Sequence, residues 1–326
     1  MADTIGRKPV IFFGVLMSFA CGMMYPLLAT VAGFLFLRLL HGFSTGFAPT
    51  GNSAFVADIV PAQRRGEAMG ILGLTSNIGT AIGPALGSEI AVAFSINVTF
   101  YTAACCAILS LLIIMRLREP LDTRQAFSPH LLKINKDDII EPRVLSPAFV
   151  TFLALFAFGC ILTVIPDYSE FLGMRNKGVF FTFYTGSSLI VRFVAGKISD
   201  YYGRVIIIKW GLVFLILGML ILAFSQKPWH LLSGACVYGV AVGFFAPTIF
   251  AWAIDLSHEQ GRGKALSTIF IALEIGIGLG ALSSGWIYAN EYTRLPWVFF
   301  VSAFFAGIAL IYLQLKYRSR SKNRGV

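Results

Sequence analysis

Charged side chains are scarce in this sequence. Asp, Glu, Lys and Arg make up 13% of the 326 residues, against about 25% in a typical soluble domain, whereas 57% of the residues are hydrophobic. This composition excludes an ordinary soluble protein and predicts a polytopic membrane protein. Apolar runs long enough to cross a bilayer, roughly 20 residues each, predict ten spans, which centre on 10–26, 30–57, 67–93, 97–115, 147–166, 178–196, 205–225, 229–254, 265–289 and 296–315.

Several chemical motifs are also absent. The sequence has no GxxxxGK[ST] loop, which disfavours direct coupling to ATP, and no HExxH pair of the kind found in metalloenzymes. Its five cysteines show no CxxC spacing and lie in apolar runs, which argues against a metal or redox site. We therefore expect no enzyme activity, no cofactor and no bound metal.

Positive charge is distributed unevenly along the chain. The formal net charge is +10, and most Lys and Arg fall in alternate loops and in the C-terminal tail, while the other loops hold only Arg175, Lys177, Lys227 and Arg294. Because the cytoplasmic loops of membrane proteins are rich in Lys and Arg, both termini are predicted to be cytoplasmic. The protein is thus expected to be multi-pass in the plasma membrane, or in the inner membrane of a bacterium, with no nucleic-acid partner.

The sequence repeats itself at a fixed offset of 197 residues. The repeated residues are charges and glycines that keep the same order in both copies, and no insertion disturbs the register. Duplication of one helical unit explains this pattern, and two equivalent halves are typical of membrane transporters. The pairs are Asp3 and Asp200, Gly6 and Gly203, Arg7 and Arg204, Gly42 and Gly239, Gly46 and Gly243, Asp58 and Asp255, Arg65 and Arg262, Gly66 and Gly263, Gly79 and Gly276, and Gly83 and Gly280.

A polar stretch divides the chain into two helical bundles. We predict a bundle of four spans at 1–116, a cytoplasmic linker at 117–146, a bundle of six spans at 147–315 and a basic cytoplasmic tail at 316–326. By the repeat offset, a first half of equal content would begin about 50 residues before Met1. We therefore expect a twelve-helix architecture that lacks its first two helices, and a native ten-helix protein with unequal halves is the alternative.

Four segments resemble the signature motifs of one family, the major facilitator superfamily. They are Ala2–Pro9 (ADTIGRKP), Gly196–Arg204 (GKISDYYGR), Arg38–Gly46 (RLLHGFSTG) and Gly79–Gly87 (GTAIGPALG), and the resemblance covers essentially the whole chain. It implies an all-α polytopic membrane protein with a two-bundle fold and about ten transmembrane helices of an expected twelve. It also implies a cytoplasmic gate formed by Asp3, Gly6, Arg7, Asp58, Asp200, Gly203, Arg204 and Asp255. The alternative is that these charges only fix helix ends and orientation.

The last of these segments carries three glycines at a spacing of four. Gly79, Gly83 and Gly87 therefore share one helix face, which predicts close packing against a neighbouring helix. Pro84 interrupts the backbone hydrogen bonds beside them. The family associates this motif with antiporters, so the resemblance implies a hinge or a contact between the halves and favours export over uptake.

Glu274 is the strongest candidate for a functional charge inside the bilayer. It lies ten residues beyond Lys264, about 15 Å along a helix, close to the middle of a membrane. A carboxylate at that depth is costly unless it is paired, hydrated or protonated. We expect Glu274 to bind a proton or a cationic substrate group, with a hydrogen bond to a neighbouring helix as the alternative. Its repeat partner, Asn77, supplies a second polar group at the equivalent position.

Two arginines are further candidates for substrate transport or coupling. Arg38 is 20 residues from Asp58, which places it near the outer interface, where a long side chain can snorkel. The resemblance instead implies a part in proton coupling for this arginine. Arg192 is eight residues from Asp200, roughly 12 Å along a helix, and we expect it to pair with a carboxylate of the gate, with a substrate contact as the alternative.

Together these features predict a secondary active transporter that exports a small organic molecule in exchange for protons by alternating access. Its expected partners are a small-molecule substrate, protons and the lipid bilayer, and it is expected to act as a monomer. A nutrient importer or uniporter of the same fold is one alternative, and it predicts transport that is indifferent to Glu274→Gln. An inactive fragment is the other.

Overall fold

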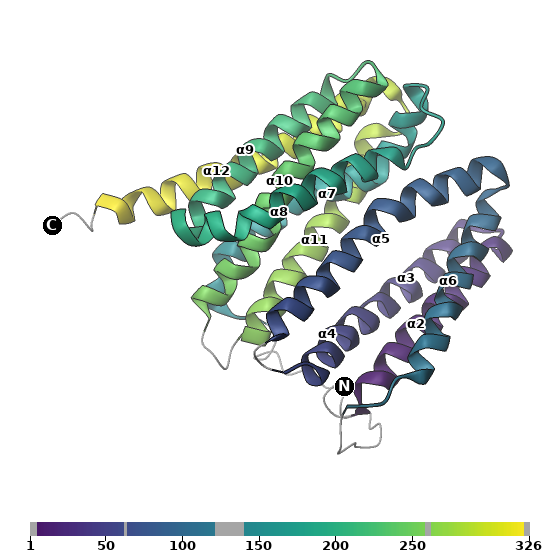
Figure 1. Ribbon diagram of the computed structural model, residues 1–326. Helices are drawn as coiled ribbons and strands as arrows, with labels where there is room; N and C mark the ends of the chain where they lie inside the picture. The colour runs from purple at the N-terminus through teal and green to yellow at the C-terminus, as the bar shows by residue number, and fades with distance from the viewer. Residues whose placement is uncertain (1–4, 62–63, 121–139, 258–261, 323–326) are drawn as a thin grey trace. The chain divides into compact units, whose positions relative to one another are not determined.

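The computed structural model describes residues 5–61, 64–120, 140–257 and 262–322 (Figure 1). Every regular element within these residues is a helix. Contacts divide the chain into two units, the first made of Met1–Gly79 and Leu86–Ile134 and the second of Thr80–Ala85 and Asn135–Val326. Asp3 and most of the predicted linker lie outside the described residues.

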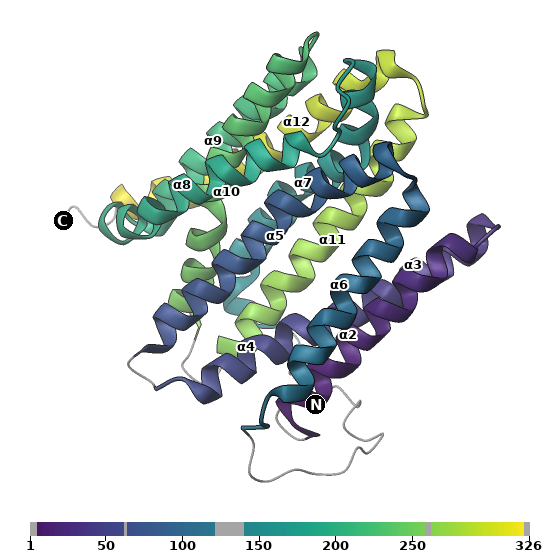
Figure 2. The same ribbon diagram turned by 45° about the vertical axis from the view of Figure 1, so that its right-hand side comes forward.

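The first unit is built around its first long helix. Helix α2 packs against α3, α4 and α6, and α2, α3 and α6 lie together in both views (Figures 1 and 2). Its buried clusters are small, one around Ile11 and Phe55 and another around Cys21 and Tyr25. The helices that contribute to the unit are α2 (Arg7–Met24), η1 (Tyr25–Leu27), α3 (Val31–Thr45), α4 (Phe47–Ile59), α5 (Arg65–Ala93) and α6 (Ile96–Arg116).

The single span predicted at 30–57 is two helices in the structure. Helix α3 begins after Thr30, whose hydroxyl caps it by accepting from the Gly33 N–H at 3.2 Å. It ends before Gly46, where α4 begins. Pro49, in the first turn of α4, has no N–H to continue the hydrogen bonds of α3, which explains why the helix does not run through without interruption.

The second unit holds the larger core. One cluster of buried apolar residues joins α7, α8, α9, α10 and α12, and Phe180, Met219, Tyr238 and Phe299 are among its completely enclosed side chains. Helices α8, α9, α10 and α12 lie side by side in both views (Figures 1 and 2). The elements are η5 (Pro142–Val144), α7 (Leu145–Phe171), α8 (Val179–Tyr202), α9 (Arg204–Ala223), α10 (Pro228–Leu256), α11 (Arg262–Tyr288), η7 (Tyr292–Arg294) and α12 (Leu295–Lys322).

Glycines bring two pairs of helices in this unit into backbone contact. On α11, a Cβ atom at Gly276 or Gly280 would collide with the carbonyl groups of Phe152 and Phe156 in α7. On α10, Gly239 and Gly243 lie against the backbone of α8 in the same way. Without side chains, these positions allow the helix axes to approach closely, which suits helices packed inside a membrane.

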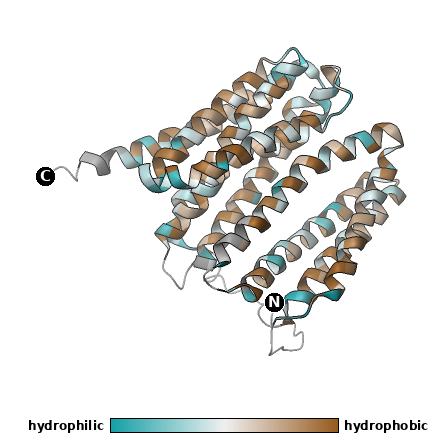
Figure 3. Cartoon of the chain, in the orientation of Figure 1, coloured by the Kyte–Doolittle hydropathy of each residue, from teal (hydrophilic) through white to brown (hydrophobic). Residues whose placement is uncertain are grey.

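Length and hydropathy agree with a membrane-spanning bundle. Within the described residues, nine helical segments are long and apolar enough to cross a bilayer, and hydrophobic colour predominates along the helices in Figure 3. The predicted span 67–93 corresponds to α5, which has 29 residues but is not among those nine. Helix α12 continues to Lys322, so the tail predicted from residue 316 begins as an extension of the last helix.

Candidate functional site

An ion pair joins the start of α2 to the end of α4. Arg7 Nε lies 2.8 Å from Asp58 Oδ2. Gly6, just before α2, has a φ of 121°, a left-handed conformation that glycine adopts without steric cost. This turn starts α2 at Arg7 and places the arginine within reach of the carboxylate.

The second unit repeats this arrangement at the same offset. Arg204 Nε lies 2.9 Å from Asp255 Oδ2, and the same guanidinium pairs with Asp200 and donates to Ser199 Oγ at 2.7 Å. Gly203, with a φ of 93°, forms the matching turn between α8 and α9. The internal repeat therefore extends from sequence to a specific pair of side chains in each unit.

The two ion pairs differ in hydration. The Arg7 and Asp58 side chains are 10% and 32% exposed, whereas those of Arg204 and Asp255 are 23% and 51% exposed. Water and salt screen an exposed pair, which contributes about 0–1 kcal/mol to stability. The pair in the first unit is therefore the less screened of the two.

A reciprocal cap, which the sequence did not reveal, ties α2 to the end of α6. The Glu119 carboxylate accepts from the backbone N–H groups of Arg7 and Lys8, at 2.9 and 2.8 Å. In return, Lys8 Nζ donates to the carbonyl oxygens of Met115 and Leu117, at 2.8 and 3.0 Å. A carboxylate suits a helix N-terminus and an ammonium suits a C-terminus. The sequence offers one signal of this cap. Gly6 precedes α2 and has no side chain to cap it, so the cap must come from another part of the chain.

Glu274 lies in the middle of α11 on an exposed surface. Within the described residues, no hydrogen bond or ion pair reaches its carboxylate. At about 100° per residue, the exposed Ser267, Gly278 and Gly285 lie within 40° of it around the helix. The large exposed apolar side chains of α11 are Phe270, which also lies within 40° of Glu274, and five that lie about 60–140° from it, Ile271, Ile275, Leu279, Leu282 and Trp286. Glu274 therefore lies beside small and polar residues and one phenylalanine, while most of the large apolar side chains lie on another side of α11.

The other candidates of the first unit are engaged locally. Asn77 Nδ2 donates to the Gly73 carbonyl of its own helix at 2.7 Å. Arg38 is exposed, and its guanidinium carbon lies 5.5 Å from the centre of the Tyr25 ring and 5.4 Å from that of Phe34. Aromatic faces attract a cation at this distance, so the rings of Tyr25 and Phe34 hold the Arg38 guanidinium. The sequence had allowed either snorkelling or proton coupling for this arginine.

Arg192 does not form the ion pair that we expected. Asp200 is bound to Arg204 instead, and Arg192 Nε is buried with no hydrogen-bond partner in the described part of the chain. Spacing along a helix fixes the depth of a side chain but does not identify its neighbours. Arg204 is only four residues from Asp200 and forms the ion pair with its carboxylate.

The glycine motif of α5 is packed at one position. Gly87 faces Thr99 of α6, whose Cγ2 would lie 3.5 Å from a Cβ at that glycine. At Gly79 and Gly83, no described atom lies within 4 Å of the Cβ position. A contact of the kind predicted from the spacing is thus found at Gly87 among the described residues.

The segment Gly42–Gly46 (GFSTG), which contains Ser44, fits the GxSxG pattern of hydrolase nucleophiles. The Ser44 side chain is completely buried, and its hydroxyl donates to the His41 carbonyl at 2.7 Å and lies 3.2 Å from Ser18 Oγ. Both of these contacts are made to residues of the helix packing. Helix packing therefore explains the motif.

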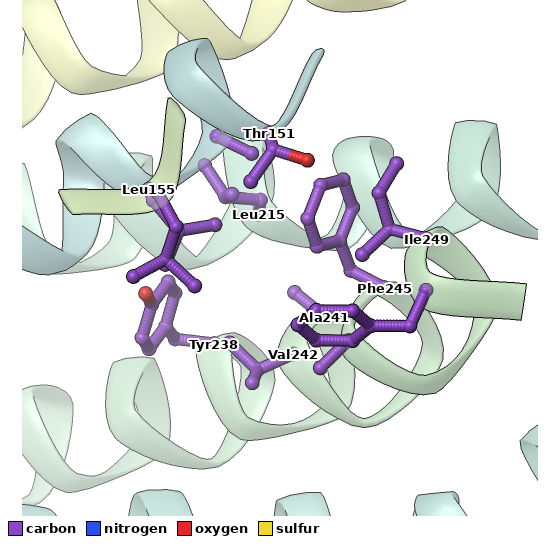
Figure 4. Close-up of a pocket in the computed structure, with 12 residues that line it drawn as sticks. Thr151, Leu155, Leu215, Tyr238, Ala241, Val242, Phe245 and Ile249 are labelled. Carbon is purple, nitrogen blue, oxygen red and sulfur yellow. The ribbon is translucent and has the colours of Figure 1, made fainter. Parts of the chain in front are cut away.

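A small cavity of about 60 Å³ lies among α7, α9, α10 and α11 in the second unit (Figure 4). Its walls are almost entirely apolar, with Thr151 and Tyr238 as the polar residues, and Thr151 donates to the Pro147 carbonyl at 2.8 Å. Sites for small organic ligands usually measure about 300–1,000 Å³. The cavity is therefore too small to be a substrate site.

Comparison with known proteins identifies the family. The family model of the Major Facilitator Superfamily matches the chain twice, over residues 1–180 and 147–326. The chain belongs to this superfamily. Multidrug resistance protein MdtG of Dickeya zeae is similar to it, with 26% identity over 334 residues, 98% of this chain and 80% of MdtG.

Solved structures agree with this membership of the superfamily. A mutant of the peptide transporter POT, in complex with sulfate, has a TM-score of 0.77 at 15% identity, covering 95% of this chain and 80% of that one. The D-xylose-proton symporter has a TM-score of 0.71 at 15% identity, covering 96% and 81%. At such identities the likeness shows a shared fold. The protein is a multi-pass membrane transporter of the superfamily and not an enzyme.

Proposed function

We propose that this transporter exports a small organic molecule in exchange for protons, as a monomer with both termini in the cytoplasm, and that Glu274 carries the proton. The observation behind the proposal is the place of Glu274, a mid-helix carboxylate of α11 with no hydrogen-bond or ion-pair partner among the described residues. Ionisable groups inside membrane spans commonly mark proton and substrate pathways.

The chemistry follows from competition for one carboxylate. Ionised Glu274 attracts a cationic group of the substrate, and protonated Glu274 does not. The proton and the cation cannot bind Glu274 at the same time. After the substrate has left, the site returns to face the cytoplasm only with a proton on Glu274, which couples export to proton entry. Alternating access of the two halves exposes the site to one side of the membrane at a time.

The paired charges of the two units are proposed as the gate. The ion pairs Arg7–Asp58 and Arg204–Asp255 lie at helix ends, and both have the modest strength of partly hydrated pairs. Contacts of that strength can form and break during each transport cycle. Asp3, as the repeat partner of Asp200, is proposed to join the gate of the first half.

Two findings support export. Similar proteins carry the name multidrug resistance protein MdtG, and the Gly79–Gly87 segment resembles an antiporter motif. Structural neighbours also include a D-xylose-proton symporter, in which protons and sugar move together, so the direction of transport must be tested separately from proton coupling.

The test is ethidium transport into inside-out membrane vesicles that contain the full chain. Ethidium is a cationic aromatic dye and serves as the probe. We expect an imposed pH gradient to drive its accumulation by the wild-type protein. Glu274→Gln removes the titratable group without changing its shape, and it should lower gradient-driven accumulation about tenfold or more, because glutamine neither takes up a proton nor attracts a cation.

A matched control uses a carboxylate that is not in the proposed site. Glu291→Gln removes the same charge at the exposed start of η7, where the side chain pairs with Arg294 at 2.6 Å. This variant should transport at the wild-type rate. Gradient-driven accumulation at the normal rate by Glu274→Gln would show that Glu274 does not carry the proton.

A further inference from the structure

The second unit contains an arginine, Arg192, whose Nε atom has no hydrogen-bond partner among the described residues. Arg192 is partly buried in α8, and its Nε atom is fully enclosed without a hydrogen bond to any described residue. Arginine keeps its charge in proteins and presents five donors in a planar fork, which fits carboxylates and phosphates. An arginine inside a membrane span normally faces a partner or a water-filled cavity, and this one faces no carboxylate in the described chain.

A second unpaired donor lies on the same face of α8. Thr185 is 1% exposed, and its Oγ1 has no hydrogen-bond partner in the described residues. Thr151 and Thr163 show the usual arrangement, in which the hydroxyl donates to the carbonyl four residues earlier. Thr185 and Arg192 are seven residues apart and therefore lie within about 20° of each other around the helix. Ser188 lies between them.

This face of α8 points away from lipid. Before its last turn, the helix has four large exposed apolar side chains, Phe183, Ile190, Phe193 and Val194. At about 100° per residue, Phe193 lies about 100° from Arg192 and the other three roughly 160–180° from it. An exposed apolar side suits the bilayer, so Thr185 and Arg192 belong to the opposite, interior side. Their depth also matches the proposed proton carrier: Arg192 is about 15 Å along α8 from Tyr202, and Glu274 is about 18 Å along α11 from Arg262.

We propose that the face formed by Thr185, Ser188 and Arg192 binds an anionic group, such as a carboxylate, of the transported molecule. Arg192 supplies the charge and the fork of donors, and Thr185 supplies a neutral donor beside it. With Glu274 at a similar depth for a cationic group, the site favours an organic molecule that carries both charges. The inference rests on the transport function proposed above and adds the chemical class of the substrate.

The test is equilibrium binding to the purified full chain in lipid nanodiscs, followed by quenching of tryptophan fluorescence, with empty nanodiscs as the background. The probes are 1-naphthoate and its neutral isostere 1-naphthamide. The wild-type protein should bind 1-naphthoate about tenfold or more tightly than 1-naphthamide, as charge-assisted hydrogen bonds predict. Arg192→Gln should abolish this preference and leave the binding of 1-naphthamide unchanged.

Three further variants separate recognition from folding. Thr185→Val keeps the shape and removes an unpaired hydroxyl, so a purely structural role predicts unchanged binding, whereas the proposal predicts several-fold weaker binding of 1-naphthoate. Arg192→Lys should keep part of the preference. Arg294→Gln removes an exposed charge and should change nothing. Thr185→Val and Arg192→Lys decide the question if Arg192→Gln does not fold.

The inference is overturned if wild-type protein does not bind 1-naphthoate, if it binds both probes equally, or if the variants at Arg192 and Thr185 keep the full preference. These outcomes are distinct from failure of the proposed function. If the wild-type protein shows no anion preference while Glu274 still controls ethidium transport, only the proposed substrate class is refuted. If ethidium transport does not depend on protons, the proposed coupling mechanism is refuted.

Discussion

At the scale of single residues, the Glu119 cap gives the first stability prediction. Glu119→Ala removes the carboxylate that accepts from two backbone N–H groups at the start of α2. The free energy of unfolding should fall by about 1–2 kcal/mol, as for other charged helix caps. Thermal unfolding of the purified protein, followed by circular dichroism, measures the change.

The control for this substitution is Glu291→Ala. Its carboxylate is exposed and pairs only with nearby Arg294 among the described residues, so its loss should change stability by no more than about 0.5 kcal/mol. Equal losses in the two variants would mean that the Glu119 cap does not stabilise α2.

Single residues also show how far the sequence could lead. Arg7 and Asp58 could be matched with Arg204 and Asp255 because a repeat fixes equivalent neighbours once one pair is known. Glu119 could not be assigned to α2, because a contact across 111 or 112 residues leaves no periodic signal. Helix spacing gives the depth of a side chain and says nothing of the neighbouring helix, so the sequence could not show that Arg192 Nε has no hydrogen-bond partner among the described residues.

At the scale of helices, the glycines of α11 and α5 should respond differently to substitution. Gly280→Leu places a side chain against the Phe156 carbonyl of α7, and overpacking of this kind should cost about 3 kcal/mol or more. Gly83→Leu in α5 meets no described atom within 4 Å, so its cost should stay below about 1 kcal/mol. Thermal unfolding of both variants checks the prediction, and similar losses would contradict it.

The contrast between these helices explains a failure of sequence reasoning. Gly79 and Gly83 are the repeat partners of Gly276 and Gly280, and the sequence predicts close packing for all four. The α11 glycines lie against α7, whereas no described atom lies within 4 Å of a Cβ at Gly79 or Gly83. A small-residue spacing thus predicts the ability to pack closely, while the presence of a neighbour decides whether the contact forms.

At the scale of the whole molecule, the sequence predicted the class of fold well. Scarce charge, apolar runs and the 197-residue repeat led to an all-helical membrane protein with equivalent halves, and membership of the Major Facilitator Superfamily agrees. These properties are spread over many residues, so local departures such as the break between α3 and α4 do not disturb them. The proposed function depends on a few side chains, Glu274 and Arg192 above all, and composition carries no information about them.

The measurement that tests proton coupling most directly is proton flux driven by substrate alone. Proteoliposomes containing the purified chain and the trapped pH indicator pyranine receive external ethidium without any imposed pH gradient. The proposed exchange predicts that ethidium entry drives protons out of the lumen, with an internal pH rise that Glu274→Gln abolishes. Ethidium entry with no change in internal pH, at the same rate in both proteins, would contradict proton-coupled transport.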